Sequence, residues 1–436
     1  MYDKSLVTKE RLDAIRKIRV EKHNEYFEYA TGVIGKEASD ALRDLYSIYD
    51  EKIYLWLAGL WDPEIGAFYY SESARDVEGF LPDIESTVQA KHHLGSAGLL
   101  TSTDGKVPAE MSLKMANYAY GLQDEDGFFY HPQWGKNITV PRRGRDLGWA
   151  TAAIREGGLT PKYPTPSDRK PEGESPSALL PEHLRTLDAW KKYLSELDLL
   201  HSSYSVGNLI QSQNGQITAA GKEFLYELFS WYERNQNTKN GTWQDEVCYS
   251  STNGLMKVAL MYAAHSRPFP NPTLSATAAI DVILLDNLNS AITSFYNPWI
   301  TIGIILGNLD KFGKNEEAEC VRKMLSDNLA EMLRMTKKKV EQFKKPDGGF
   351  SYNISCSSRT SQGAIVAMPE APEGDVNGNG LASTGVVRNV CSAIGLEPLA
   401  FFVKEDSELF FELIAASYSQ PKITEEEYLR RTEAKQ

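Results

Sequence analysis

A group of arginines lies close to a tyrosine–histidine pair in an otherwise acidic chain. Arg142, Arg143 and Arg145 form the group. Tyr130 and His131 stand just before it. A guanidinium binds a carboxylate through two parallel hydrogen bonds, which suits a uronic acid as substrate. The sequence therefore suggests a site that recognises an acidic sugar.

The same residues could carry out β-elimination from a uronate. That reaction needs a base to remove the C5 proton, a group that stabilises the enediolate, and an acid for the leaving oxygen. His131 as the base, an arginine at the carboxylate and Tyr130 as the acid would meet these needs. A structural interpretation stays open, in which the arginines pair with Asp146 and Glu125 and His131 packs beside Pro132.

Further polar candidates stand where apolar helices are expected to begin. His201 and Tyr249 are additional catalytic candidates, and Tyr204 and Asn253 are candidates for substrate binding. Hydrolysis would instead need two carboxylates on opposite sides of a glycosidic bond. The carboxylates that could serve are Glu85, Asp146, Asp245 and Glu246. No pair among them stands out, so hydrolysis remains open beside elimination, with Glu85 and Asp146 taken as substrate-binding residues.

Aromatic residues crowd the same part of the sequence and could stack on sugar rings. Trp149 and Trp299, together with Trp134, are the better candidates for such subsites. The aromatics that follow a glycine are expected to be structural instead. These are Phe68, Phe129, Trp243 and Phe350.

The elements that must position these residues are indicated by a repeated loop of the form Gly-x-aromatic. It occurs four times, at residues 61–70, 123–131, 237–245 and 345–352, each time between two helical segments. Glycine permits a turn that other residues resist, and the aromatic can fill the layer between helix ends. A repeated helix–turn–helix unit predicts stacked hairpins.

Two kinds of helix alternate along the chain. Amphipathic charged helices are expected at 11–29, 36–60, 107–122, 182–197, 217–235, 273–289, 315–344 and 406–418. Six nearly uncharged helices are expected to begin at Asp83, Asp146, Ser202, Ser250, Asn297 and Leu381. Low charge all round predicts burial on all sides, so the second set should form an inner ring.

This alternation predicts an all-α fold, an (α/α)6 toroid of six hairpins in one domain over residues 1–436. The inner-helix N-termini and the Gly-x-aromatic loops would ring one mouth of a central cavity. An open α-solenoid is the alternative. Residues 1–35 should pack outside the rings, residues 160–181 should form a proline-rich surface loop, and residues 355–380 should form a loop over the cavity mouth.

The loops resemble those of a known superfamily of α/α toroids. Gln123-x3-Gly127-x-Phe129 and Gln342-x5-Gly348-x-Phe350 resemble the QW repeat of terpenoid cyclases, and Asn235-x5-Gly241-x-Trp243 is a looser copy. The cyclases' D-x-D-D and D-D-x-x-D motifs are missing. Asp126-Gly-Phe-Phe-Tyr-His131 looks like a loop of toroid polysaccharide lyases. The resemblance implies a toroid and a carbohydrate-active enzyme, with an isoprenoid-handling or non-catalytic binding toroid as the alternative.

The composition limits the possible partners. A net charge of −12 argues against a nucleic-acid or anionic-membrane binder. No uninterrupted apolar stretch of about 18 residues is present, and the first residues lack the apolar segment of a signal peptide, so a cytoplasmic location is expected. We expect a small oligosaccharide substrate, no cofactor and no metal, and the sequence leaves the oligomeric state open.

Overall fold

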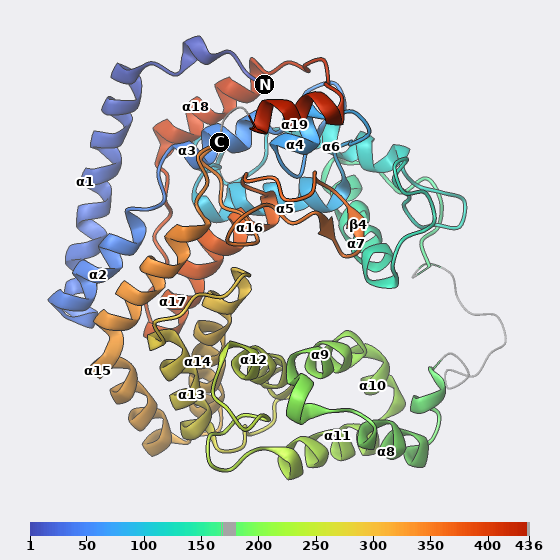
Figure 1. Ribbon diagram of the computed structural model, residues 1–436, viewed down its shortest axis with the longest axis vertical. Coiled ribbons are helices and arrows are strands. Elements are labelled where there is room, and N and C mark those ends of the chain that lie inside the picture. Colours follow the sequence, from blue (N-terminus) through green and yellow to red (C-terminus); the bar gives the residue numbers. More distant parts are fainter. Residues whose placement is uncertain (167, 169–179, 434–436) are drawn as a thin grey trace.

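The computed structural model describes residues 1–166, 168 and 180–433, and its regular structure is almost entirely helical (Figure 1). Strands form only two short antiparallel ribbons among the described residues, β1 (Trp61–Asp62) with β2 (Ala67–Phe68) and β3 (Thr360–Ser361) with β4 (Ala364–Ile365). The prediction of an all-α fold is confirmed.

The helices predicted for the inner ring pack against one another in succession, although the one at 140–156 is charged and not nearly uncharged as predicted. These inner helices are α5 (Ile84–Ala97), α7 (Val140–Glu156), α9 (Leu199–Ser212), α12 (Tyr249–Ala264), α14 (Thr293–Lys311), and α16 (Val376–Gly380), which continues through a π-helical turn (Leu381–Gly385) into α17 (Val386–Ile394). α9 packs against α12, α12 against α14, and α14 against α17. From α16 the succession continues to α5 and then to α7. α7 and α9 do not pack together to a comparable extent, and their ribbons stand apart in Figure 1.

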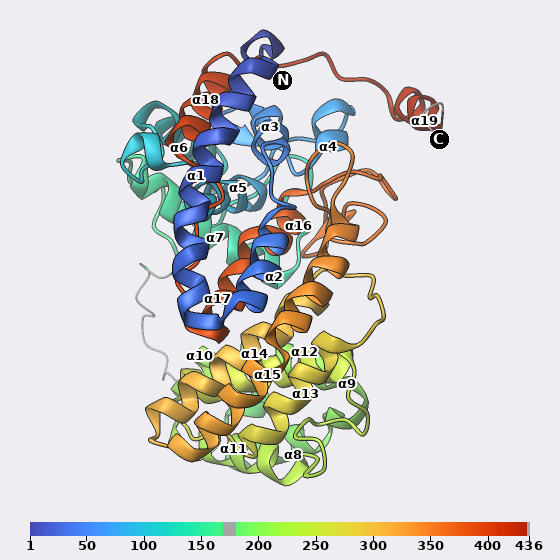
Figure 2. The same ribbon diagram turned by 90° about the vertical axis from the view of Figure 1, so that its left-hand side faces the viewer.

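Several of the remaining helices pack against this succession, as α6 (Ala109–Gly121) does against α7 and α13 (Pro272–Leu284) against α14. The longer of the remaining helices are α1 (Lys9–Ile34), α2 (Lys36–Tyr46), α3 (Lys52–Gly59), α6, α8 (Leu187–Ser195), α11 (Lys222–Asn235), α13, α15 (Asn315–Val340) and α18 (Lys404–Ala415). Shorter ones are α4 (Glu72–Asp76), α10 (Asn214–Ala220), α19 (Glu425–Glu433) and 3-10 turns at Lys4–Leu6, Thr101–Thr103, Glu182–Leu184 and Glu341–Phe343. Figure 2 shows α1 and α2 side by side and α19 at the end of an extended stretch.

Several predicted boundaries need correction. The helix expected over 217–235 is divided into α10 and α11, the one expected from Asn297 begins at Thr293, and the one expected from Leu381 begins at Val376. The helix expected over 36–60 is divided into α2 and α3. The helix expected to begin at Asp146 begins instead at Val140, because the Thr139 side chain accepts a hydrogen bond from the Arg142 amide and caps it. The three arginines therefore lie inside α7 and not in the loop before it, and Asp146 is not its N-cap.

The glycines of the four repeated loops share one backbone conformation. Gly66, Gly127, Gly241 and Gly348 all have a positive φ. A Cβ at Gly66 would lie 2.7 Å from Cβ of Lys114 on α6, and one at Gly348 would lie 2.7 Å from Cβ of Lys52. Glycine is thus required both for the turn and for the close approach of another hairpin.

The aromatic of each loop is buried, as predicted. Phe68, Phe129, Trp243 and Phe350 are at most 1% exposed. The glutamine pattern is only partly right. Gln123 and Gln236 each donate to the carbonyl oxygen of their loop glycine, so Gln236 and not Asn235 belongs to the repeat. Gln342 donates to Lys338 instead.

One large hydrophobic cluster extends from Ile15 to Leu413, and a smaller one joins α5, α6 and α7. Among the described residues, no helix is long and apolar enough to cross a membrane. The proline-rich loop expected over 160–181 falls largely on residues 167 and 169–179, which are outside the described residues.

Candidate functional site

The low charge expected for the inner helices predicted burial on all sides, but the structure leaves part of each helix exposed. Each keeps a stripe of partly exposed positions at helical spacing, such as Arg145, Trp149 and Ala152 on α7 or Asn253 and Lys257 on α12. Small and polar residues on these stripes avoid the cost of exposing apolar side chains. The stripes define the surface on which a ligand could bind.

Several of these side chains interact across helices that are not neighbours in sequence. We call this set the inner polar surface. It comprises Glu85, Gln89, Arg145, Trp149, Tyr204, Lys257, Tyr296, Tyr352, Asn377 and Arg388.

Arg145 is the most prominent cation of the inner polar surface. Its side chain is 43% exposed, and Nη1 donates to Oε1 of Glu85 at 2.7 Å. Its guanidinium carbon also lies 5.6 Å from the ring centre of Trp149. The exposed remainder of the guanidinium can still bind a carboxylate.

Lys257 on α12 lies near Arg145 of α7. Burial lowers the pKa of the Lys257 ammonium, and the positive charge of Arg145 lowers it further. Lys257 Nζ donates to Oε1 of Gln211 at 3.0 Å and lies 5.7 Å from the ring centre of Tyr204. A lysine with a lowered pKa is more often neutral and can act as a base.

Three tyrosines and another arginine extend the surface. Burial raises the pKa of Tyr296, and the nearby phenols of Tyr352 and Tyr204 raise it further, whereas Arg388 opposes the shift. Burial and then Tyr352 likewise raise the pKa of Tyr204. The raised pKa values of Tyr296 and Tyr204 keep these two phenols protonated at neutral pH, so they carry a proton that they could donate.

Arg142 is not available to a ligand, which corrects its assignment as a substrate-binding residue. It is completely buried, and its guanidinium pairs with Asp83 at 2.6 Å, Asp146 at 3.0 Å and Glu85 at 3.4 Å. Burial raises the pKa of Asp146 to about 7, with the charges of Asp83 and Glu85 also raising it and Arg142 opposing. Three carboxylates around one buried guanidinium leave an excess of negative charge, which favours the protonated form of Asp146.

The position of His131 does not suit a catalytic base. It is 4% exposed, its Nε2 lies 2.8 Å from the Pro82 carbonyl oxygen, and its Nδ1 accepts from the Gln133 amide. Both ring nitrogens are thus occupied. Tyr130 donates to Asp126 at 2.8 Å. These contacts support the structural interpretation of the pair.

Other candidates from the same loops also have structural contacts. Arg143 lies over the ring of Phe128, with 4.9 Å between guanidinium carbon and ring centre. The ring of Trp134 lies tilted against that of His131, with 4.2 Å between the ring centres, and its Nε1 donates to the Ile365 carbonyl oxygen.

The remaining sequence candidates are scattered. The His201 side chain is 74% exposed and its Nδ1 faces Asp198 at 2.9 Å. Tyr249 is 5% exposed and donates to the carbonyl oxygen of Asn287. Trp299 is fully buried and donates to Thr336, so it offers no ring face to a sugar. The structure thus corrects the assignment of Tyr249 and Trp299 to a ligand site.

Glu85, Arg145, Trp149 and Tyr204 are the sequence candidates that the structure brings together. Asn253 is half-buried and accepts from Asn297 of α14 at 2.9 Å. The remaining members of the surface were missed. Helical spacing could have found two of them, since Gln89 follows Glu85 and Lys257 follows Asn253 by one turn.

The segment 355–380 lies against the starts of α4 and α7. The carbonyl oxygen of Gln362 accepts from Thr139, that of Ser361 accepts from Arg142, and the Met368 amide donates to Ser73 Oγ. Its end forms α16, which carries Asn377 of the inner polar surface. The segment therefore connects the inner polar surface with the buried arginine cluster.

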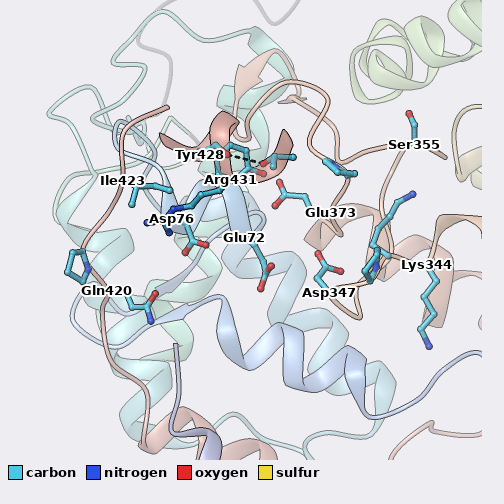
Figure 3. Close-up of a pocket in the computed structure, with 15 residues that line it drawn as sticks. Glu72, Asp76, Lys344, Asp347, Ser355, Glu373, Gln420, Ile423, Tyr428 and Arg431 are labelled. Carbon is cyan, nitrogen blue, oxygen red and sulfur yellow. Dashed lines mark hydrogen bonds between the residues drawn. The ribbon is translucent and has the colours of Figure 1, made fainter. Parts of the chain in front are cut away.

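A separate cavity of about 810 Å³ lies between α4, the segment at 344–347 and the C-terminal residues (Figure 3). Glu72, Asp347 and Glu373 face its interior. Burial raises the pKa of Glu373 to about 7, and the carboxylate accepts from the amide and hydroxyl of Ser73. Because Glu373 already accepts hydrogen bonds from Ser73, it has a structural role, and the inner polar surface is the stronger candidate for a ligand site.

No family model, no curated protein and no solved structure matches this chain. Within the part of the chain that the structure describes, no group of three or more His, Cys, Asp or Glu side chains is arranged to hold a metal ion. The function must therefore be inferred from the site itself.

Proposed function

We propose that this chain is an (α/α)6 toroid that cleaves a uronate-containing oligosaccharide by β-elimination. The alternating inner and outer helices and the four Gly-x-aromatic loops support the architecture. The weak packing between α7 and α9 leaves one position where the ring is less tightly closed. An opening there would admit a chain-like substrate from the side.

The observation that carries the proposal is the approach of Arg145 and Lys257 from two separate inner helices. Burial and then the charge of Arg145 lower the pKa of Lys257, so a protonated Lys257 is unfavourable there without an anion beside the two side chains. They stand together in a chain with a net charge of −12. A ligand carboxylate would relieve this repulsion.

The elimination follows from the order of side chains along the surface. Arg145 binds the uronate carboxylate and stabilises the enediolate. Lys257 removes the proton from C5 in its deprotonated form, which burial of the side chain favours. The electron pair of the C5–H bond forms the C4–C5 double bond as the C4–O bond breaks. Tyr204 gives its phenolic proton to the leaving oxygen, and Lys257 and Tyr204 regain their starting states by proton exchange with water.

Hydrolysis is less well supported by the arrangement. It needs an acid and a second carboxylate that face each other across the scissile bond. Glu85 is the carboxylate that the described inner polar surface provides, and it is 1% exposed and paired with Arg142 and Arg145. The polar character of the surface also counts against an isoprenoid ligand.

The test is cleavage of a panel of acidic and neutral oligosaccharides. Elimination yields an unsaturated uronate, which absorbs in the ultraviolet, together with one new reducing end per cut. New reducing ends without that absorbance would identify a hydrolase. No cleavage of any acidic oligosaccharide by the wild-type chain would contradict the proposal.

A further inference from the structure

Deeper than Glu85, polar side chains continue along two packed inner helices. Gln89 and His93 follow Glu85 on successive turns of α5, opposite Asn377 and Asn379 of α16. Gln89 Nε2 donates to Glu85 Oε1 at 3.2 Å and to Asn377 Oδ1 at 3.4 Å. Asn379 Nδ2 lies 3.3 Å from His93 Nε2. We call Gln89, His93, Asn377 and Asn379 the amide cluster.

The amide cluster has more hydrogen-bonding capacity than the described protein groups satisfy. Gln89 Oε1, Asn379 Oδ1 and His93 Nδ1 are buried atoms without a hydrogen-bond partner among the described residues. His93 is 2% exposed and Asn379 is 1% exposed. Native proteins rarely leave such atoms unpaired, because each one loses its hydration without compensation. A bound group that offers hydrogen bonds would remove this cost.

The backbone beside the cluster is also unusual. The π-helical turn Leu381–Gly385 begins two residues after Asn379, and the Ser383 hydroxyl donates to the Asn379 carbonyl oxygen. π-Helical turns are rare and frequently occur at functional sites. The turn places Asn377 and Asn379 on one side of it, against α5, and Arg388 of the inner polar surface on the other.

The charge of the cluster indicates what kind of ligand it can take. Its members are three amides and a histidine whose pKa burial lowers to about 4, so they are neutral at pH 7. A carboxylate would lose hydration there and be repelled by Glu85, and an ammonium would find Glu85 already paired with Arg142 and Arg145. Hydroxyl groups both donate to amide oxygens and accept from amide N–H groups, so a neutral polyol satisfies the cluster best.

We propose that the amide cluster is a subsite that binds adjacent hydroxyl groups of a neutral sugar residue, next to the uronate held by Arg145. This inference rests on the proposed function, since it places the neutral residue in the same oligosaccharide. Gln89 and Asn377 are half-buried and form the accessible rim. His93 and Asn379 lie behind them, and a bridging water links them to the sugar hydroxyls.

Saturation-transfer NMR on the full chain tests the subsite with two separate probes. Methyl β-D-glucopyranoside probes the amide cluster, and sodium D-glucuronate probes Arg145. The variant Gln89→Met keeps the side-chain length and removes both polar atoms. We expect it to weaken binding of the neutral glycoside about tenfold, from the loss of hydrogen bonds, and to weaken glucuronate binding by clearly less than that. Gln342→Met, on the distant turn Glu341–Phe343, is the matched control.

A second variant of the amide cluster and a glucuronate-binding test on Arg145→Met separate the failure of the subsite from the failure of the proposed function. Asn377→Leu should weaken the neutral glycoside in the same way, with a melting temperature close to that of the wild type. The subsite proposal fails if wild type gives no transfer to the glycoside, or if both variants bind it normally. The proposed function fails separately if glucuronate binding survives Arg145→Met, whatever the glycoside shows.

Discussion

Arg145 Nη1 lies 2.7 Å from Oε1 of Glu85, a carboxylate that is itself almost completely buried. The other oxygen of the same carboxylate lies 3.4 Å from Arg142, one turn earlier on α7. Glu85 thus links a buried ion cluster to an exposed cation. Two arginines in one short sequence motif consequently have different roles.

This difference predicts opposite effects for matched substitutions. Arg142→Met removes the guanidinium that compensates Asp83, Asp146 and Glu85, so it should lower the free energy of unfolding by about 3–5 kcal/mol. Arg145→Met should lower it by about 1 kcal/mol or less, because the side chain is partly solvated. Chemical denaturation of both variants measures the contrast. Equal losses would show that the cluster does not depend on Arg142.

Glu373 predicts a dependence of stability on pH. Burial raises its pKa from 4.5 to about 7 in the folded state. The folded state then favours the protonated form, so this contribution is fully present below pH 4.5 and is lost as the pH rises through 7. Glu373→Gln keeps the shape and cannot ionise. We expect it to exceed the wild type in stability above pH 7 by up to about 3 kcal/mol, from 1.36 kcal/mol per pKa unit.

Thermal melting across that pH range checks this expectation. Glu370→Gln is the control, because it removes an exposed carboxylate from the same segment. A difference between Glu373→Gln and wild type that stays constant with pH would mean that Glu373 is already ionised in the folded state.

The histidines chosen from the sequence should behave differently from catalytic groups. His201→Ala should leave turnover and melting temperature unchanged, since the side chain is exposed and its ring nitrogen faces the exposed Asp198 at its own helix start. His131→Ala should lower stability by about 1–3 kcal/mol, because the Pro82 carbonyl oxygen and the Gln133 amide each lose a partner. A loss of turnover in His201→Ala at normal stability would restore it as a catalytic candidate.

The sequence predicted the helices and the repeated loops well, because their signals are local. Positive φ at Gly66 and burial of Phe68 follow from turn chemistry and spacing alone. The capping of α7 by Thr139 was equally local but was overlooked, and this moved the arginines from a loop into a helix.

Which arginine is buried could not be read from the motif. Arg142 and Asp146 stand four residues apart on one face of α7, whereas Arg145 is rotated away from them. Only the position of α5, with Asp83 and Glu85 at its start, decides which face is covered. Lys257 was missed for a similar reason, since its importance depends on the approach of α7, which is distant in the sequence.

The proposed catalytic role of Lys257 predicts a specific pH profile. A neutral lysine is the active base, so turnover should rise with pH and level off above the pKa of Lys257. Lys257→Met should reduce turnover about 100-fold or more, from the usual contribution of a general base. Arg145 lowers that pKa, so Arg145→Met should move the rising limb to higher pH in addition to raising KM for the acidic substrate.

Tyr204→Phe should reduce turnover without moving the rising limb of the pH profile to higher pH, because its phenol serves as the acid. The measurement is the initial rate of unsaturated product formation against pH for the four proteins. A limb that stays at the same pH in Arg145→Met, or that persists in Lys257→Met, would show that another group removes the proton.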